Sequence, residues 1–327
     1  MSRPSPQTER LIDLVDLLAS APTEEFTLAD IARAAGLGKP TVHPMVVALA
    51  RRGWLLRDPG TRTYRLGPAL VAAGRAAAEG NPVLTAARPV VRDLAAATGL
   101  VCVALVAGGV PGEEDDLVVG EIADPADDRR PSAPTGQRWR GHPRGLRPGD
   151  RIPPRPPLGA VQVAWSDPET IDRWLDRLDA EQRGDAAGEL APALAAIRER
   201  GWALEVGDQL RERLGRLVAD FDADQRNAEH AAALRRVLTE IGRAFGVTET
   251  LPTAISPDGQ YRASVVNAPV FDAAGGVAVV LCLLCVREGH RVPLRTGAEI
   301  VALGTRLRAS AESLTHGLGG RWPPPFA

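Results

Sequence analysis

The 327-residue sequence is poor in residues that build several common sites and scaffolds. It has three cysteines, too few for a disulfide framework in a chain of this length. Its five histidines are scattered, and none lies at zinc-site spacing from a cysteine. No apolar run reaches the roughly 18 residues that a membrane-spanning helix needs. We therefore expect no metal, no cofactor and no membrane partner.

The sequence also has no large excess of positive or negative charge. It contains 39 basic and 41 acidic residues, and the formal net charge is −2. A chain of this charge has no overall cationic field, so any contact with nucleic acid must come from a local basic surface. The first residues contain no apolar signal-peptide segment, which predicts a cytoplasmic protein. Apolar residues amount to 44 %, enough for the two domains that this length suggests.

Residues 1–67 follow the element order of a winged helix-turn-helix. Thr27, with Asp30 three residues later, is a good N-cap for a second helix, and Pro40 suits the start of a third. A turn signal at residues 58–61 separates two β-prone runs and predicts a hairpin. The predicted helices cover residues 8–20, 28–35 and 40–52, and the predicted strands cover residues 54–57 and 63–66.

Residues 83–315 predict an α+β domain built around an antiparallel sheet, and a linker helix over residues 68–82 precedes it. The apolar runs at residues 100–107 and 277–286 predict buried strands, whereas residues 158–165 fit either a helix or a strand. Further strands are predicted over residues 202–206 and 261–271, and further helices over residues 83–98, 168–178, 192–200 and 298–314.

Three segments of the second domain lack this regular pattern. Residues 111–157 are rich in proline and polarised in charge, and form either a solvated loop or a flap over a ligand pocket, with an edge strand possible at 116–122. Residues 208–246 predict a helical insertion whose apolar faces pack on its own domain, in a subunit interface or on a partner. The tail, residues 316–327, is rich in glycine and proline and predicts disorder.

The stretch at residues 27–71 reads TLADIARAAGLGKPTVHPMVVALARRGWLLRDPGTRTYRLGPALV, and it resembles the IclR family of bacterial transcription regulators. Two looser matches follow in the family's order, RERGWAL at residues 198–204 and NAPVFDAAGGVAVVLCL at residues 267–283. The resemblance implies a winged helix-turn-helix that binds a double-stranded DNA operator, and a GAF-like domain that binds a small organic effector. It also implies a homodimer or tetramer. Because the sequence shows no Ser/His/Asp set, phosphate-binding loop or metal motif, we expect a protein that is not an enzyme.

Basic residues gather on the third predicted helix and on the hairpin, while acids gather in the first helix and the loop after it. This separation is typical of a DNA-binding face, in which a recognition helix enters the major groove and neighbouring cations contact phosphates. The candidate DNA-binding residues are Lys39, Thr41, His43, Arg51, Arg57 and Arg62.

Pro44 departs from the family pattern, because family members usually carry arginine at this position. Proline removes a backbone donor and a cationic contact together. Since Pro44 lies in the first turns of the third helix, we expect a small kink and an altered sequence preference, not loss of the helix. The alternative is a degenerate family member that acts as a protein-interaction module without DNA binding.

The resemblance also marks an effector site in the second domain. The candidate effector-binding residues are Leu158, Gly159, Glu205, Val265, Asn267, Cys282 and Leu284. Several of them replace polar residues of the family. The sequence therefore predicts either a larger, more apolar effector that Glu205 and Asn267 orient, or a packed core that binds none.

Cys282 and Cys285 form a C-x-x-C pair, a spacing that also occurs in redox and zinc sites. On a strand, however, positions i and i+3 point to opposite faces, and the run around them is uniformly apolar. We therefore expect two buried structural thiols.

Overall fold

The computed structural model describes residues 5–20, 24–107, 117–125, 148–149, 151–152, 154, 156–178, 180–207, 250–285 and 292–324. These residues fall into two compact units, which meet in the sequence at Asn81 and Pro82. The predicted insertion at residues 208–246 and most of residues 111–157 lie outside the described residues. None of the described helices has the length and hydrophobicity that crossing a bilayer requires.

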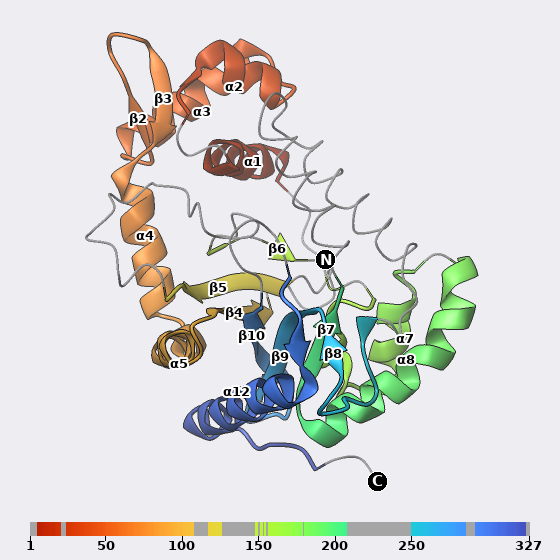
Figure 1. The fold of residues 1–327 in the computed structure, drawn as a ribbon. Coiled ribbons are helices and arrows are strands. Elements are labelled where there is room, and N and C mark those ends of the chain that lie inside the picture. Colours follow the sequence, from red (N-terminus) through yellow and green to blue (C-terminus); the bar gives the residue numbers. More distant parts are fainter. Residues whose placement is uncertain are drawn as a thin grey trace. The chain divides into compact units, whose positions relative to one another are not determined.

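The first unit combines helices with a three-stranded sheet of order β1-β3-β2 (Figure 1). Its elements are α1 (Pro6–Ser20), β1 (Phe26–Thr27), α2 (Leu28–Ala34), α3 (Lys39–Arg51), β2 (Leu55–Arg57), β3 (Thr63–Leu66) and α4 (Pro68–Glu79). The predicted capping box forms at the start of α2, where Thr27 Oγ1 accepts from the N–H of Asp30 and the Asp30 carboxylate accepts from the N–H of Thr27. The winged helix-turn-helix order is therefore present.

Helix α3 continues through Pro44, as the position of this proline near the helix start predicts. Gly38 is its N-cap residue, and Pro40 occupies the first turn, where a missing N–H costs nothing. One face of α3 is buried in the core of the unit and is formed by Val42, Met45, Val46 and Leu49. The opposite face is left exposed.

The second unit is built on a six-stranded antiparallel sheet of order β6-β5-β4-β10-β9-β7. The sheet strands are β4 (Val101–Ala107), β5 (Leu117–Ala123), β6 (Arg151–Ile152), β7 (Ala203–Val206), β9 (Ala263–Phe271) and β10 (Val277–Leu284). A separate two-stranded ladder pairs β8 (Gln260–Tyr261) with β11 (Arg295–Thr296). The mixed composition and the central antiparallel sheet confirm the predicted α+β class.

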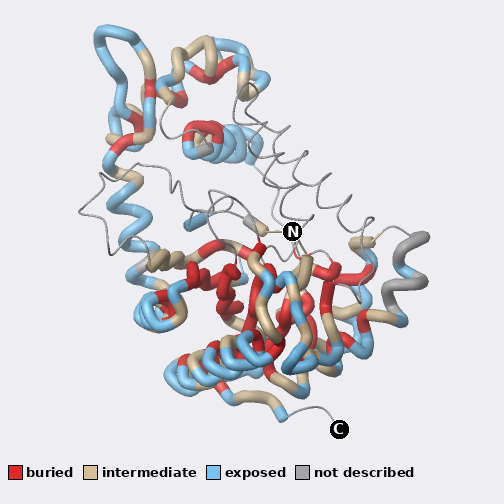
Figure 2. Tube along the Cα trace, in the orientation of Figure 1, coloured by how far each residue is buried: buried red, intermediate tan, exposed pale blue. Residues whose placement is uncertain are grey.

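Helices cover both faces of this sheet, so the unit has three layers (Figures 1 and 2). On one face, α5 (Pro82–Thr98) and α12 (Gly297–Gly317) pack against the strands. The other face is covered by α6 (Ala160–Val163), α7 (Pro168–Leu175) and α8 (Ala180–Arg200). Each face has its own buried apolar cluster, because successive strand residues point to opposite sides.

The structure corrects three predictions in the second unit. Residues 117–123 are an inner strand, because β5 pairs with β4 on one side and β6 on the other. Helix α8 begins at Ala180, since Pro192 lies inside it and does not start it. The tail is not disordered over residues 316–324, because α12 runs to Gly317 and the Trp322 ring packs on Phe271, with ring centroids 5.1 Å apart.

The cysteines behave as the strand period predicts. Cys282 lies in the cluster under α6–α8, whereas Cys285 lies in the cluster under α5 and α12. The third, Cys102, is also buried, and burial raises the pKa of its thiol to about 12. Within the described part of the chain, no group of three or more His, Cys, Asp or Glu side chains is placed to hold a metal ion.

Candidate DNA-binding surface and effector face

A hollow of about 690 Å³ lies in the first unit between α3, the start of α2 and the wing, by which we mean β2, β3 and the turn between them (residues 55–66). We call it the α3–wing hollow. Its lining residues are Thr27, Leu28, Ala29, His43, Val47, Ala50, Arg51, Arg57, Thr61, Arg62 and Tyr64. It brings together four of the predicted DNA-binding residues, namely His43, Arg51, Arg57 and Arg62.

The spacing along α3 explains why these side chains meet. His43, Val47 and Arg51 follow one another at intervals of four residues, so they project from one side of the helix. The wing supplies Arg57 and Arg62 from across the hollow. The described residues of the lining include three arginines, one histidine and no acid, so the hollow favours a negatively charged ligand such as a phosphate backbone.

The wing turn is held by Asp58. Its Oδ1 accepts hydrogen bonds from the N–H groups of Gly60 at 2.7 Å and Thr61 at 2.9 Å. These backbone hydrogen bonds lower the pKa of Asp58, so the carboxylate is fully charged at neutral pH and committed to the turn. Arg62 follows with a φ of +59°, the one positive φ of a non-glycine residue in the described chain.

Because Arg62 has a left-handed backbone conformation, two substitutions can separate the effect of that conformation from the effect of the side-chain charge. A non-glycine residue in this conformation costs about 1 kcal/mol, so Arg62→Gly should leave the free energy of unfolding unchanged or raise it by up to about 1 kcal/mol. Arg62→Ala retains the strain. If Arg62 contacts phosphate, both variants should lower DNA affinity by the same factor and reduce the salt slope by about 1. Urea unfolding and binding titrations check this, and wild-type affinity in the glycine variant would contradict the role.

Two predicted residues lie outside the hollow. Lys39 is the first residue of α3 and is exposed, and Thr41 is half-buried two residues later. Both remain at the N-terminal end of the helix, the part that reads bases in a helix-turn-helix.

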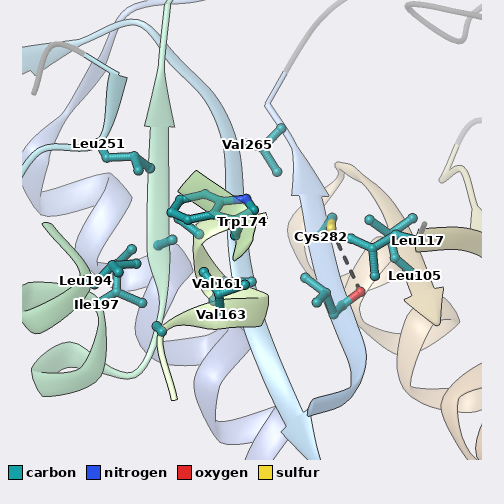
Figure 3. Close-up of a cluster of buried hydrophobic side chains, with 14 of the residues drawn as sticks. Leu105, Leu117, Val161, Val163, Trp174, Leu194, Ile197, Leu251, Val265 and Cys282 are labelled. Carbon is teal, nitrogen blue, oxygen red and sulfur yellow. Dashed lines mark hydrogen bonds between the residues drawn. The ribbon is translucent and has the colours of Figure 1, made fainter. Parts of the chain in front are cut away.

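The predicted effector residues of the strands share one face of the large sheet, which we call the effector face. Val265 lies opposite Glu205 on β7 and Leu284 on β10. Asn267 lies opposite Cys282 in the next row. Figure 3 shows Val265 and Cys282 among the buried apolar side chains of this face, with Trp174 from α7.

Polar groups on the effector face are few. Asn267 is buried, and its Nδ2 donates to Glu205 Oε1 at 2.6 Å, while its Oδ1 is buried and has no hydrogen-bond partner among the residues that the structure describes. Because a carboxylate only accepts, this contact fixes the orientation of the amide. The other predicted strand residues, Val265, Cys282 and Leu284, are all buried in the apolar cluster.

Leu158 and Gly159 lead into α6, the helix that covers the effector face. The Leu158 carbonyl accepts from Trp174 Nε1 at 3.1 Å. Gly159 has a φ of +85°, and a Cβ there would lie 2.6 Å from Pro154 Cβ, so the turn requires glycine. These two residues therefore shape the segment that packs on the face, and their backbone is already committed to that turn.

Comparison with known proteins identifies the type of DNA-binding domain that the first unit contains. Residues 7–59 match the family model of the IclR helix-turn-helix domain. The HTH-type transcriptional regulator BhcR of Paracoccus denitrificans is 27 % identical over 201 residues, which cover 60 % of this chain and 65 % of BhcR. XynR of Escherichia coli, also named an HTH-type transcriptional regulator, is 25 % identical over 60 % of this chain and 73 % of XynR. The first unit therefore carries a helix-turn-helix domain of the IclR type.

Solved structures of this family share the fold. An IclR transcriptional regulator from Alicyclobacillus acidocaldarius has a TM-score of 0.61 and 20 % identity, with 97 % of this chain and all of that one covered. An IclR homolog from Microbacterium hydrocarbonoxydans, solved in complex with 4-hydroxybenzoate, has a TM-score of 0.54 and 13 % identity, covering 95 % of this chain and 99 % of that one. Both are similar to this chain in architecture.

Several residues that line the α3–wing hollow are not among the DNA-binding residues predicted from the sequence. Val47 could have been found from its interval of four residues to His43 and Arg51. Tyr64 lies beneath Arg57, whose guanidinium carbon is 6.0 Å from the ring centroid. The contribution of Thr27, Leu28 and Ala29 carries no local signal, because it depends on β1 pairing with β3 of the wing.

Proposed function

We propose that this chain is an IclR-family regulator that binds a specific double-stranded DNA operator through α3 and the wing, and that it acts in the cytoplasm as a homodimer or tetramer. The α3–wing hollow carries the proposal, because it joins His43 and Arg51 of the recognition helix to Arg57 and Arg62 of the wing, with no acid among its described lining residues. Lys39 and Thr41 complete the DNA contacts at the start of α3. A symmetric oligomer would bind two half-sites, which multiplies specificity.

The second part of the proposal is a small-molecule effector on the effector face. The support is the pair formed by Glu205 and Asn267, because Asn267 Oδ1 is a buried acceptor that an effector's donor group would satisfy. The surrounding strand residues are apolar, which suits a largely apolar molecule. Leu158 and Gly159 would close the site from the side of α6.

The test is an electrophoretic mobility shift on DNA flanking the protein's own gene, at two salt concentrations and with unrelated competitor DNA. A specific, salt-sensitive shift supports the regulator. No preference over competitor, in a protein shown by circular dichroism to be folded, would reject sequence-specific binding and favour the protein-interaction module that Pro44 suggests. An effector should change the shift of the wild type and leave that of Asn267→Leu unchanged.

A further inference from the structure

The outward face of α3 carries apolar residues between its exposed cations. Pro40, Pro44 and Ala48 are exposed and Val47 is half-buried. Intervals of three and four residues place them in one stripe, opposite the buried face of the helix. We call these four residues the apolar stripe.

Cations border this stripe. Lys39, His43 and Arg51 are exposed on the same helix, and the wing adds Arg57 and Arg62. An apolar protein partner would have to leave these cations desolvated, whereas DNA supplies phosphates for them and base edges for the stripe. Charge complementarity therefore selects the major groove of DNA as the surface that covers the stripe.

The chemistry of the stripe restricts what it can read. Neither proline has a side-chain hydrogen-bond donor or a backbone N–H, and the side chains of valine and alanine are purely apolar. Among the four bases, thymine alone presents an apolar group in the major groove, its C5-methyl. Lys39, Thr41 and His43 can therefore recognise bases by hydrogen bonds, whereas the apolar stripe can recognise them only by van der Waals contact.

We infer that the apolar stripe recognises thymine C5-methyl groups, and that Pro44 and Val47 determine specificity for thymine at the centre of each half-site. The inference rests on the proposed DNA binding and deepens it. The inference also assigns Pro44 a function in base recognition, because replacing the family's arginine by proline exchanges a polar contact for an apolar one. The operator of this protein should therefore carry thymine where α3 approaches the base edges.

The test replaces thymine by uracil, which removes the methyl and keeps base pairing. Operator sequences are first selected by the full-length protein from a random duplex library, and each thymine is then exchanged singly. We expect about three- to fivefold weaker binding at each contacted thymine, the value of one buried methyl group, and no change at the others. Fluorescence anisotropy at fixed salt measures the affinities.

Two variants assign the effect to the stripe. Val47→Ala should make binding less sensitive to uracil at one position, which a double-mutant cycle detects. Val71→Ala is the matched control, because Val71 is an exposed valine on α4, outside the stripe, and the full uracil effect should persist. Pro44→Arg should shift the selected base from thymine toward guanine, the base that arginine prefers.

The possible results are distinguishable. Selected sites without thymine at their centre, or wild-type affinity after every uracil exchange, would overturn the thymine inference while leaving DNA binding intact. An equal uracil effect in wild type and in both Val47→Ala and Pro44→Arg would also overturn it, because the stripe would not be the reader. Failure to select any sequence would reject the proposed DNA binding itself.

Discussion

Reversing two charges of the α3–wing hollow, Arg51→Glu together with Arg57→Glu, is expected to weaken operator binding by at least about 100-fold. The two guanidinium groups approach the hollow from α3 and from the wing. Each charge-assisted contact to phosphate is worth roughly 1.5–3 kcal/mol, and two of them account for this loss before repulsion is added. The slope of log affinity against log salt should also fall by about 2, because two fewer counterions are released.

The control for this variant is a second double reversal with the same change in net charge. Arg173→Glu with Arg306→Glu places the new acids on exposed positions of α7 and α12 in the second unit. Affinity should stay near that of the wild type, because neither Arg173 nor Arg306 lines the hollow. Equal losses in both double variants would show that net charge, and not the hollow, drives binding.

Local signals made most of the first unit predictable from sequence. The capping box of Thr27 and Asp30 forms as expected, and Gly36, with a φ of +63°, follows the end of α2. These features depend on residues within a few positions of one another, so no tertiary information is needed. The strand period likewise predicts that Cys282 and Cys285 lie on opposite faces of the sheet.

The errors arose where packing overrides a local rule. Pro192 predicts a helix start, yet α8 begins twelve residues earlier, because a proline inside a helix is tolerated when the packing around it compensates. The tail is rich in glycine and proline, yet Trp322 anchors it on Phe271 and under the Arg308 guanidinium. A single aromatic contact with a residue far away in the sequence carries no local signal.

The candidate site was predictable in parts. The basic residues of α3 and the wing can be found from composition, but the hollow between them depends on the pairing of β1 with β3. On the effector face, the period of two places Val265 with Asn267, and Cys282 with Leu284, on the same side. The contact between Asn267 and Glu205 joins strands 62 residues apart and requires the structure.

The second large effect concerns the stability of the second unit. Phe271→Ala should lower its free energy of unfolding by about 3–5 kcal/mol, the usual cost of removing a buried aromatic ring. Phe271 is fully buried, and its ring packs edge-on against Trp165 at 5.3 Å and Trp322 at 5.1 Å between centroids. Urea unfolding followed by circular dichroism measures the loss, and Val71→Ala, an exposed valine of the first unit, should stay within about 0.5 kcal/mol of wild type.

A double-mutant cycle of Phe271→Ala with Trp322→Ala separates burial from anchoring of the tail. If the tail is held by this ring contact, the two losses should fall short of additivity by about 0.5–1.5 kcal/mol, the value of an aromatic pair. The Arg308 guanidinium carbon, 5.5 Å from the Trp322 ring centroid, adds to the cost of the single tryptophan variant but cancels in the cycle. Strict additivity would mean that the Phe271–Trp322 pair contributes no interaction energy, and that other contacts of Trp322, such as the one with Arg308, hold the tail.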